Sequence, residues 1–144
     1  MGKIGLVCVT NHNYGSILQT FALQTIVNNL GVETEIVRYN ESKFSKIRRL
    51  RNKEYMRTRF KVIEKKITLT FLYRKYSHLL QERNIAFSKF ISTNLKFSDV
   101  LFSLSELNRK AYNYDIVLLG SDQVWHPMNL YMNFFTLNFV PDKI

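Results

Sequence analysis

Two short polar segments hold most of the side chains that could do chemistry. Residues 10–16 and 120–126 each follow an apolar run, and together they contain His12, His126 and Asp122. An imidazole titrates near neutral pH and can act as a general acid or base, and a carboxylate can act as a base or bind a hydroxyl. The two segments therefore predict proton transfer or the binding of a hydroxylated substrate.

Each of these side chains also has an ordinary structural explanation. A histidine in a polar loop is often a surface or hydrogen-bonding residue, and an aspartate directly after a strand often forms a turn or caps a helix. Trp125 could stack on a sugar ring, although a lone tryptophan is more often a packing residue. The residue types alone leave both interpretations open at each position.

The first segment also resembles an anion site, because Ser16 and the backbone N–H groups around Gly15 lie where a helix is expected to begin. It is not a dinucleotide fingerprint, since the other glycines of Gly-x-Gly-x-x-Gly are missing, and there is no Walker sequence. One cysteine, no His-x-x-x-His pair and no acidic cluster predict that the protein holds no metal. We also expect no resident cofactor.

The elements that must position these segments are those of an α/β fold. Residues 3–9 are almost continuously apolar, which is typical of a central parallel strand covered on both faces. A helix should follow, ending near Gly31 at its C-cap, and residues 33–39 predict a second strand. The apolar stripe expected to face the core of that helix consists of Ile17, Leu18, Phe21, Ala22, Ile26, Val27 and Leu30.

The rest of the chain continues this pattern. Residues 42–95 contain no glycine or proline and favour helices, with clear helical spacing in 79–91. Residues 103–106 form a Ser-x-x-Glu capping box before a helix expected to end near Asn113, and residues 114–120 predict another buried strand. Ligands of open α/β sheets bind at the carboxyl ends of strands, so both polar segments should face one crevice.

Composition limits the classes of protein that remain. The 144 residues suit one domain, and 46% hydrophobic with 22% charged residues exclude general disorder. Apolar runs are too short to span a bilayer and no signal-peptide pattern is present, so we expect a cytoplasmic protein. The single cysteine, Cys8, lies in an apolar run and is expected to be buried and inert.

The net charge of +10 comes from one segment. Residues 43–83 contain 14 basic and 3 acidic residues, which leaves 7 basic and 8 acidic residues elsewhere. With its aromatic residues, this segment could contact nucleic acid or the anionic inner face of a membrane, or it could be a solvated helix face. No nucleic-acid motif accompanies it, so nucleic acid is the weakest of these interpretations.

Three stretches together resemble a known family, the polysaccharide pyruvyl transferases. The first runs from His12 to Gln19 and continues at Ala22–Leu23–Gln24, and the second is Gly120–Ser121–Asp122–Gln123–Val124–Trp125 after Tyr114–Asp115. The third, residues 134–139, resembles the aromatic strand that follows in the family. His126 is a departure, because many members carry asparagine there.

The resemblance implies a Rossmann-like parallel sheet with helices on both faces. Residues 1–144 would be the N-terminal domain of a two-domain, GT-B-like transferase, truncated before its C-terminal half, with 43–83 as a basic helical insert. The family transfers the pyruvyl group of phosphoenolpyruvate, the donor substrate, to two sugar hydroxyls of a cell-surface polysaccharide. The missing half would come in cis or in trans, and the acceptor would be a sugar or a lipid-linked oligosaccharide.

By the same resemblance, this chain would supply the acceptor-side wall. Asp122 and then His12 are the candidates for catalysis. The expected substrate-binding residues are Asn13, Tyr14, Gly15, Ser16, Ser121, Gln123, Trp125 and His126. The alternatives are a non-catalytic basic binding module and an inactive remnant whose open strand edge makes it poorly soluble.

Overall fold

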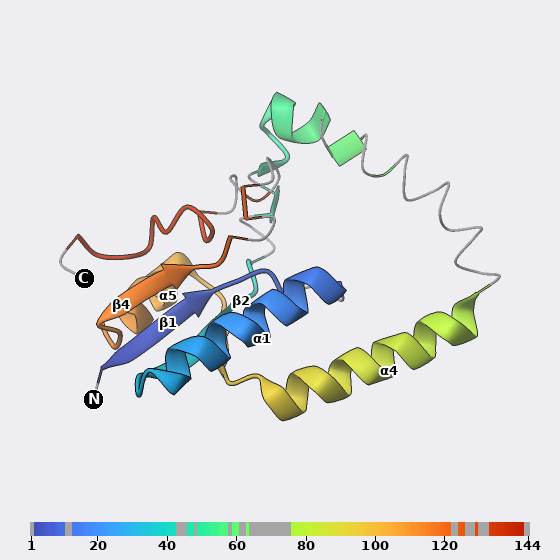
Figure 1. Cartoon of the computed structure of the whole chain (residues 1–144). Coiled ribbons are helices and arrows are strands. Elements are labelled where there is room, and N and C mark those ends of the chain that lie inside the picture. Colours follow the sequence, from blue (N-terminus) through green and yellow to red (C-terminus); the bar gives the residue numbers. More distant parts are fainter. Residues whose placement is uncertain are drawn as a thin grey trace.

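Four parallel strands form one sheet in the computed structural model of the chain (Figure 1). The structure describes residues 2–10, 13–42, 46–47, 49–57, 59–60, 63, 76–121, 124–125, 129 and 133–142. Among them the strand order is β3-β2-β1-β4. The strands are β1 (Lys3–Val7), β2 (Glu33–Tyr39), β3 (Phe97–Leu101) and β4 (Ile116–Leu119). The expected α/β class with a parallel sheet is confirmed.

The first strand-helix-strand unit is confirmed closely. The strand β1 pairs in parallel with β2 on one side and with β4 on the other, and helix α1 (Tyr14–Asn29) connects β1 to β2. The strand expected over 33–39 is present with those bounds, whereas β1 ends at Val7, two residues earlier than expected. The two strands at the centre of the sheet are therefore β1 and β2.

The ends of α1 follow from their local sequence. The side-chain oxygen of Asn13 accepts a hydrogen bond from the Gly15 N–H at 3.0 Å and caps the first turn. At the other end Gly31 has φ +80°, a left-handed conformation that favours glycine, and its N–H donates to the Asn28 carbonyl at 2.9 Å. The predicted C-terminal glycine of this helix is confirmed.

The predicted apolar stripe of α1 is wrong in part. Leu18, Ile26 and Leu30 are 54%, 60% and 75% exposed. The buried face instead carries the following residues: Ser16, Ile17, Thr20, Gln24 and Val27. Polar groups can face the sheet here because they have partners. The Gln24 amide donates to the Lys96 carbonyl and accepts from the Lys96 N–H, both at 3.0 Å.

Two further helices are well defined. Helix α4 (Ser77–Asn94) confirms the helical spacing seen in 79–91, and residues 53–57 are also helical. Helix α5 (Leu104–Ala111) begins with the predicted capping box, in which the Ser103 hydroxyl accepts from the Glu106 N–H at 3.1 Å. The Glu106 carboxylate accepts from the Phe102 N–H at 2.7 Å. This helix ends two residues before the expected position.

The two edge strands differ most from the sequence predictions. No strand was expected at β3, where Ser98 and Asp99 are polar and where the strand depends on its pairing with β2. The Arg38 N–H donates to the Ser98 hydroxyl at 3.0 Å. The strand β4 was expected to be buried, but Ile116 is 53% exposed because β4 lies at the other edge. A strand with one neighbour cannot be covered as fully as a central one.

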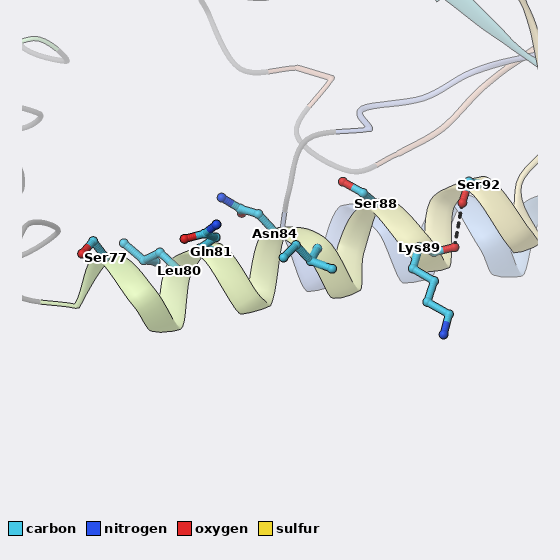
Figure 2. A pocket seen from close by; sticks show the side chains of 8 residues that line it. Ser77, Leu80, Gln81, Asn84, Ser88, Lys89 and Ser92 are labelled. Atoms are coloured by element: carbon cyan, nitrogen blue, oxygen red, sulfur yellow. Dashed lines mark hydrogen bonds between the residues drawn. The ribbon is translucent and has the colours of Figure 1, made fainter.

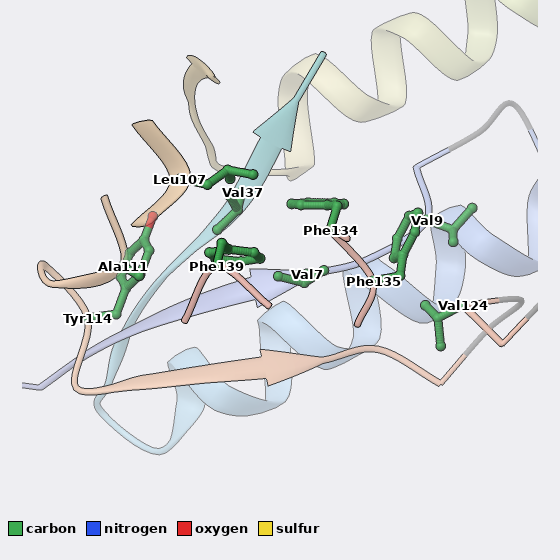
Figure 3. Close-up of a cluster of buried hydrophobic side chains, with 10 residues drawn as sticks. All are labelled: Val7, Val9, Val37, Leu107, Ala111, Tyr114, Val124, Phe134, Phe135 and Phe139. Carbon is green, nitrogen blue, oxygen red and sulfur yellow. The ribbon is translucent and has the colours of Figure 1, made fainter. Parts of the chain in front are cut away.

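Helices and turns cover both faces of the sheet, as predicted. On one face Leu6, Cys8 and Ile36 pack with residues of α1 and α4, including Phe21 and Ile91. On the other, the strands pack against α5 and the C-terminal aromatic residues (Figure 3). The members of this second cluster are Val7, Val9, Val37, Leu107, Ala111, Tyr114, Val124, Phe134, Phe135 and Phe139.

The aromatic strand expected over residues 134–139 is wrong. These residues form turns, and the left-handed conformations of Asn133 (φ 52°) and Leu137 (φ 56°) interrupt any extended run. The aromatic side chains are buried nevertheless. The Phe134 ring centroid lies 5.0 Å from that of Phe135 and 5.8 Å from that of Phe139. The segment therefore contributes to the core as a folded cap and not as a strand.

One buried carboxylate joins β2 to β1 and α5. Glu35 is 6% exposed, and it accepts from the Tyr114 hydroxyl at 2.5 Å. Lys110 Nζ and Lys3 Nζ lie 2.7 Å and 3.2 Å from its oxygens. Burial opposes ionisation, but the bonds from Lys110, Tyr114 and Lys3 outweigh it and lower the pKa of Glu35 to about 2. Burial and the bond to Glu35 raise the pKa of Tyr114.

Candidate functional site

The two polar segments meet at the carboxyl edge of the sheet, as the strand order requires. Val7 at the end of β1 is paired with Leu119 at the end of β4. The Gly120 N–H donates to the Val7 carbonyl at 2.8 Å, and a Cβ on Gly120 would lie 2.9 Å from Cys8 Sγ. The backbone after β4 therefore passes so close to β1 that a side chain at position 120 would force a neighbour to move.

Cys8 is buried at this contact, as expected. Burial raises the pKa of its thiol, although hydrogen bonds with the Thr20 side chain and the Gly120 backbone act in the opposite direction. A thiol that stays protonated is a poor nucleophile. Cys8 therefore acts as a small packing residue under the site.

A side-chain bridge connects the two segments. The Gln19 amide of α1 donates to the Ser121 hydroxyl at 2.6 Å, across 102 residues of sequence. Gln19 was not assigned to the site from the sequence. Residues three and four positions apart share a helix face, so its spacing from Gly15 and Ser16 was the signal that could have identified it. Its bond connects the segment after β4 to α1 at the carboxyl edge of the sheet.

The other predicted site residues differ in accessibility. Tyr14 is 63% exposed and Trp125 is 67% exposed, so Trp125 is not the packing residue that its type suggested. Ser16 is 1% exposed, so the predicted residues at the start of α1 that reach the surface are Asn13, Tyr14 and Gly15. The ring of Tyr14 lies 4.7 Å from that of Phe87, a contact that connects the start of α1 to α4.

Four predicted site residues lie outside the described residues. They are His12, Asp122, Gln123 and His126. Their proposed roles in catalysis and in substrate binding stay predictions. Asn13 follows His12 and caps α1, and Ser121 precedes Asp122 and accepts a hydrogen bond from Gln19. Both described neighbours lie at the carboxyl edge of the sheet.

A cavity of about 450 Å³ opens at the same edge, and the sequence did not predict it. Its lining comes from the ends of β1, β2 and β3 and from the C-terminal turns. The residues are Cys8, Val9, Thr10, Val37, Arg38, Tyr39, Asn40, Val100, Asn129, Phe134 and Phe135. The signal for Asn40 was its position directly after β2, since ligands of parallel sheets bind at strand ends.

The lining of this cavity consists mainly of apolar side chains, with a few polar groups. Phe134 and Phe135 are buried, and the Tyr39 ring lies 5.4 Å from that of Phe134. Burial, with a smaller contribution from Glu41, raises the pKa of Tyr39, so its hydroxyl stays neutral. Hydroxyl and amide groups are supplied by Thr10, Asn40 and Asn129. Such a surface can hold a small, neutral, hydroxylated ligand.

Two other cavities carry less functional information. The larger, about 830 Å³, lies along α4, and all its lining residues come from that one helix (Figure 2). Within it the Ser92 hydroxyl donates to the Lys89 carbonyl at 3.0 Å. A smaller apolar cavity of about 270 Å³ lies between α1 and α4 beside Arg83. Neither brings together polar groups from several elements, as a binding site requires.

The described part of the chain has neither a metal-binding cluster nor a membrane-spanning helix. Its His, Cys, Asp and Glu residues form no group of three or more that could hold a metal ion. None of its helices is both long and apolar enough to cross a membrane.

Comparisons with known proteins give one result. A family model described as "Polysaccharide pyruvyl transferase" matches residues 13–144, which is most of the chain. The match includes residues 13–16 of the first polar segment and all of the second, while His12 lies just before it. The comparison with curated proteins and the comparison with solved structures give no match.

Proposed function

The chain belongs to the polysaccharide pyruvyl transferase family, and we propose on that premise that it serves pyruvyl transfer from phosphoenolpyruvate to a sugar. The product would be a cyclic ketal on a cell-surface polysaccharide or its lipid-linked precursor, as in exopolysaccharide biosynthesis. The observation that carries the proposal is the meeting of the two family segments at one edge of the sheet, where Gln19 holds Ser121.

The reaction sets clear chemical demands. The methylene carbon of phosphoenolpyruvate gains a proton, and two sugar hydroxyls form bonds to the neighbouring carbon as its bond to the phosphate oxygen breaks. The first hydroxyl proton balances the proton gained by carbon, and the second leaves with phosphate or solvent. The protein must therefore remove protons from hydroxyls, deliver one to carbon and bind the anionic donor.

The residues at the edge match the acceptor side of this chemistry. Asp122 follows Ser121 directly, and we assign it the role of base or hydroxyl ligand, with His12 as the second acid or base. The acceptor would be bound by Asn13, Tyr14, Gly15, Ser121, Gln123, Trp125 and His126. Ser16 is buried and would contribute to acceptor binding through its place in the first turn of α1. Phosphoenolpyruvate is a substrate in this scheme, and no further cofactor is required.

We further propose that this chain is the N-terminal, Rossmann-like half of a GT-B-like transferase. The strand order β3-β2-β1-β4 supports this, because it matches one half of the common doubly wound sheet and one further strand. The donor-binding cations would come from a second domain, in cis or in trans. The basic insert at 43–83 would lie outside the reaction centre.

The proposal is tested by phosphate release from phosphoenolpyruvate with the chain and a C-terminal half supplied together. We expect release that requires both the protein and a saccharide acceptor. Release that is equally fast without any acceptor would indicate a phosphatase and contradict transfer to sugar.

A location at the inner face of a membrane fits the basic segment. Ile47 and Phe60 are 60% and 62% exposed. The same segment carries exposed cationic residues, namely Lys46, Arg51, Lys53, Arg57 and Arg59. Arg49 pairs with buried Glu41, which ties the segment to the end of β2. Apolar side chains among cations suit an anionic bilayer surface, where lipid-linked acceptors are assembled.

We expect the triple change Arg51→Gln, Lys53→Gln and Arg57→Gln to weaken binding to anionic vesicles about a hundredfold, because each surface cation contributes about 1 kcal/mol. Co-sedimentation with vesicles containing phosphatidylserine measures this. The matched control, Lys89→Gln with Arg109→Gln, removes charges outside the segment and should change little. Binding that is equal on neutral vesicles, or indifferent to salt, would contradict contact of the basic segment with anionic lipid.

A further inference from the structure

We propose that the 450 Å³ cavity at the ends of β1, β2 and β3 is the subsite for a neutral pyranose ring of the acceptor. This inference rests on the proposed function, since it names where the sugar lies. Its polar residues Thr10, Asn40 and Asn129 lie outside the three stretches quoted above for the family resemblance, although Asn40 and Asn129 fall within the matched residues 13–144.

The position of the cavity supports a substrate role. The cavity opens at the carboxyl ends of β1, β2 and β3, and the carboxyl edge is where open parallel sheets bind ligands. Thr10 extends from β1 toward the segment that begins α1, and Asn40 follows β2 directly. A sugar ring bound in this cavity would lie at the same edge of the sheet as Ser121, which directly precedes Asp122 in the sequence.

The chemistry of the lining favours a sugar. A pyranose has an apolar face of C–H groups and a rim of hydroxyls, and it needs an apolar surface together with hydroxyl and amide partners. The apolar surface is supplied by Phe134, Phe135 and Tyr39. The hydroxyl and amide partners are supplied by Thr10, Asn40 and Asn129, which come from three separate segments of the chain.

The charge of the lining argues against the donor as occupant. Among the described lining residues, Arg38 is the one that carries a charge. Its Nε already donates to the Ser98 carbonyl at 3.0 Å, and its guanidinium lies 5.4 Å from the centre of the Phe97 ring. Phosphoenolpyruvate carries a carboxylate and a phosphate, which call for several cations or N–H groups. A neutral ring is the better fit.

The test is ligand-observed NMR with a panel of methyl pyranosides of glucose, galactose, mannose and N-acetylglucosamine. We expect saturation transfer to at least one of them and a loss of affinity of about fivefold to tenfold in Asn40→Ala, because one hydrogen bond to the ring is removed. Thr10→Val should act likewise and Thr10→Ser should restore binding. Asn113→Ala, at the opposite edge of the sheet, is the matched control.

The subsite and the proposed function can fail separately. If no pyranoside binds, or if Asn40→Ala binds as well as the unchanged chain while its thermal unfolding is normal, the subsite is overturned. If a pyranoside binds through Asn40 but phosphoenolpyruvate yields no ketal, the subsite stands and pyruvyl transfer fails. If transfer occurs and Asn40→Ala leaves the KM for the acceptor unchanged, transfer stands and the subsite is overturned.

Discussion

Replacing Glu35 by glutamine is expected to lower the free energy of unfolding by about 3 kcal/mol. Its pKa is lowered from an ordinary 4.5 to about 2, and a shift of this size corresponds to about that much stabilisation of the charged form in the folded state. The substitution also leaves Lys3 and Lys110 without their common carboxylate. Urea unfolding at pH 7 measures the effect, which corresponds to a fall in Tm of about 10 °C.

Glu33→Gln is the matched control on the same strand. Its carboxylate also pairs with a lysine, since Lys96 Nζ lies 2.6 Å away, but both side chains are more than half exposed. Exposed pairs contribute little, so we expect a change within about 0.5 kcal/mol. Equal effects of the two substitutions would contradict the structural role assigned to burial of Glu35.

The stability contributed by Glu35 should depend on pH in one direction. Because its pKa is lower in the folded chain than in the unfolded chain, the contribution is complete above about pH 5 and is lost as the pH falls toward 2. In Glu35→Gln this part of the acid dependence should disappear. If the slope of unfolding free energy against pH is unchanged in the variant, other carboxylates are responsible for the acid dependence and the role assigned to Glu35 is contradicted.

Asp122→Asn is expected to lower kcat for ketal formation by about a hundredfold or more. The proposed base would lose its ability to accept the hydroxyl proton, and positioned bases contribute about 100- to 10,000-fold to a rate. Asparagine keeps the shape of the side chain and most of its hydrogen bonds, so folding and the KM for the acceptor should change little. Steady-state kinetics across pH 5–9 measure both effects.

Asp99→Asn on β3 is the control for this change, because Asp99 is exposed and lies on an edge strand. It should retain full activity. If Asp122→Asn also retains kcat while His12→Gln loses it, the base is assigned to the wrong residue. If both variants are fully active, the catalytic assignment at this edge is wrong.

Local sequence predicted the elements whose cause is local. The strand β2, the C-terminal glycine of α1 and the capping box of α5 each depend on a few neighbouring residues, and each is present. The buried face of α1 depends on Lys96, which lies 72 residues from Gln24 and satisfies its amide. Periodicity alone could not reveal that partner, so it assigned Leu18 and Ile26 to the core.

The same distinction applies to the site. The two polar segments were identified from their positions after apolar strands, and parallel pairing of β1 with β4 brings them together. The sequence did not predict the cavity because distant segments form it, and because Phe134 and Phe135 line it from turns instead of the expected strand. Gln19 was missed because its bond to Ser121 depends on where β4 ends.

The central claim is that the carbon skeleton of phosphoenolpyruvate moves intact to a sugar. The most direct measurement is ¹³C NMR of a reaction with [2-¹³C]phosphoenolpyruvate, a saccharide acceptor, this chain and a C-terminal half. We predict a new quaternary ketal carbon bonded to two sugar oxygens, formed in equal amount with free phosphate and formed about a hundredfold more slowly with Asp122→Asn. Release of phosphate with labelled pyruvate as the carbon product, and no ketal, would contradict the account.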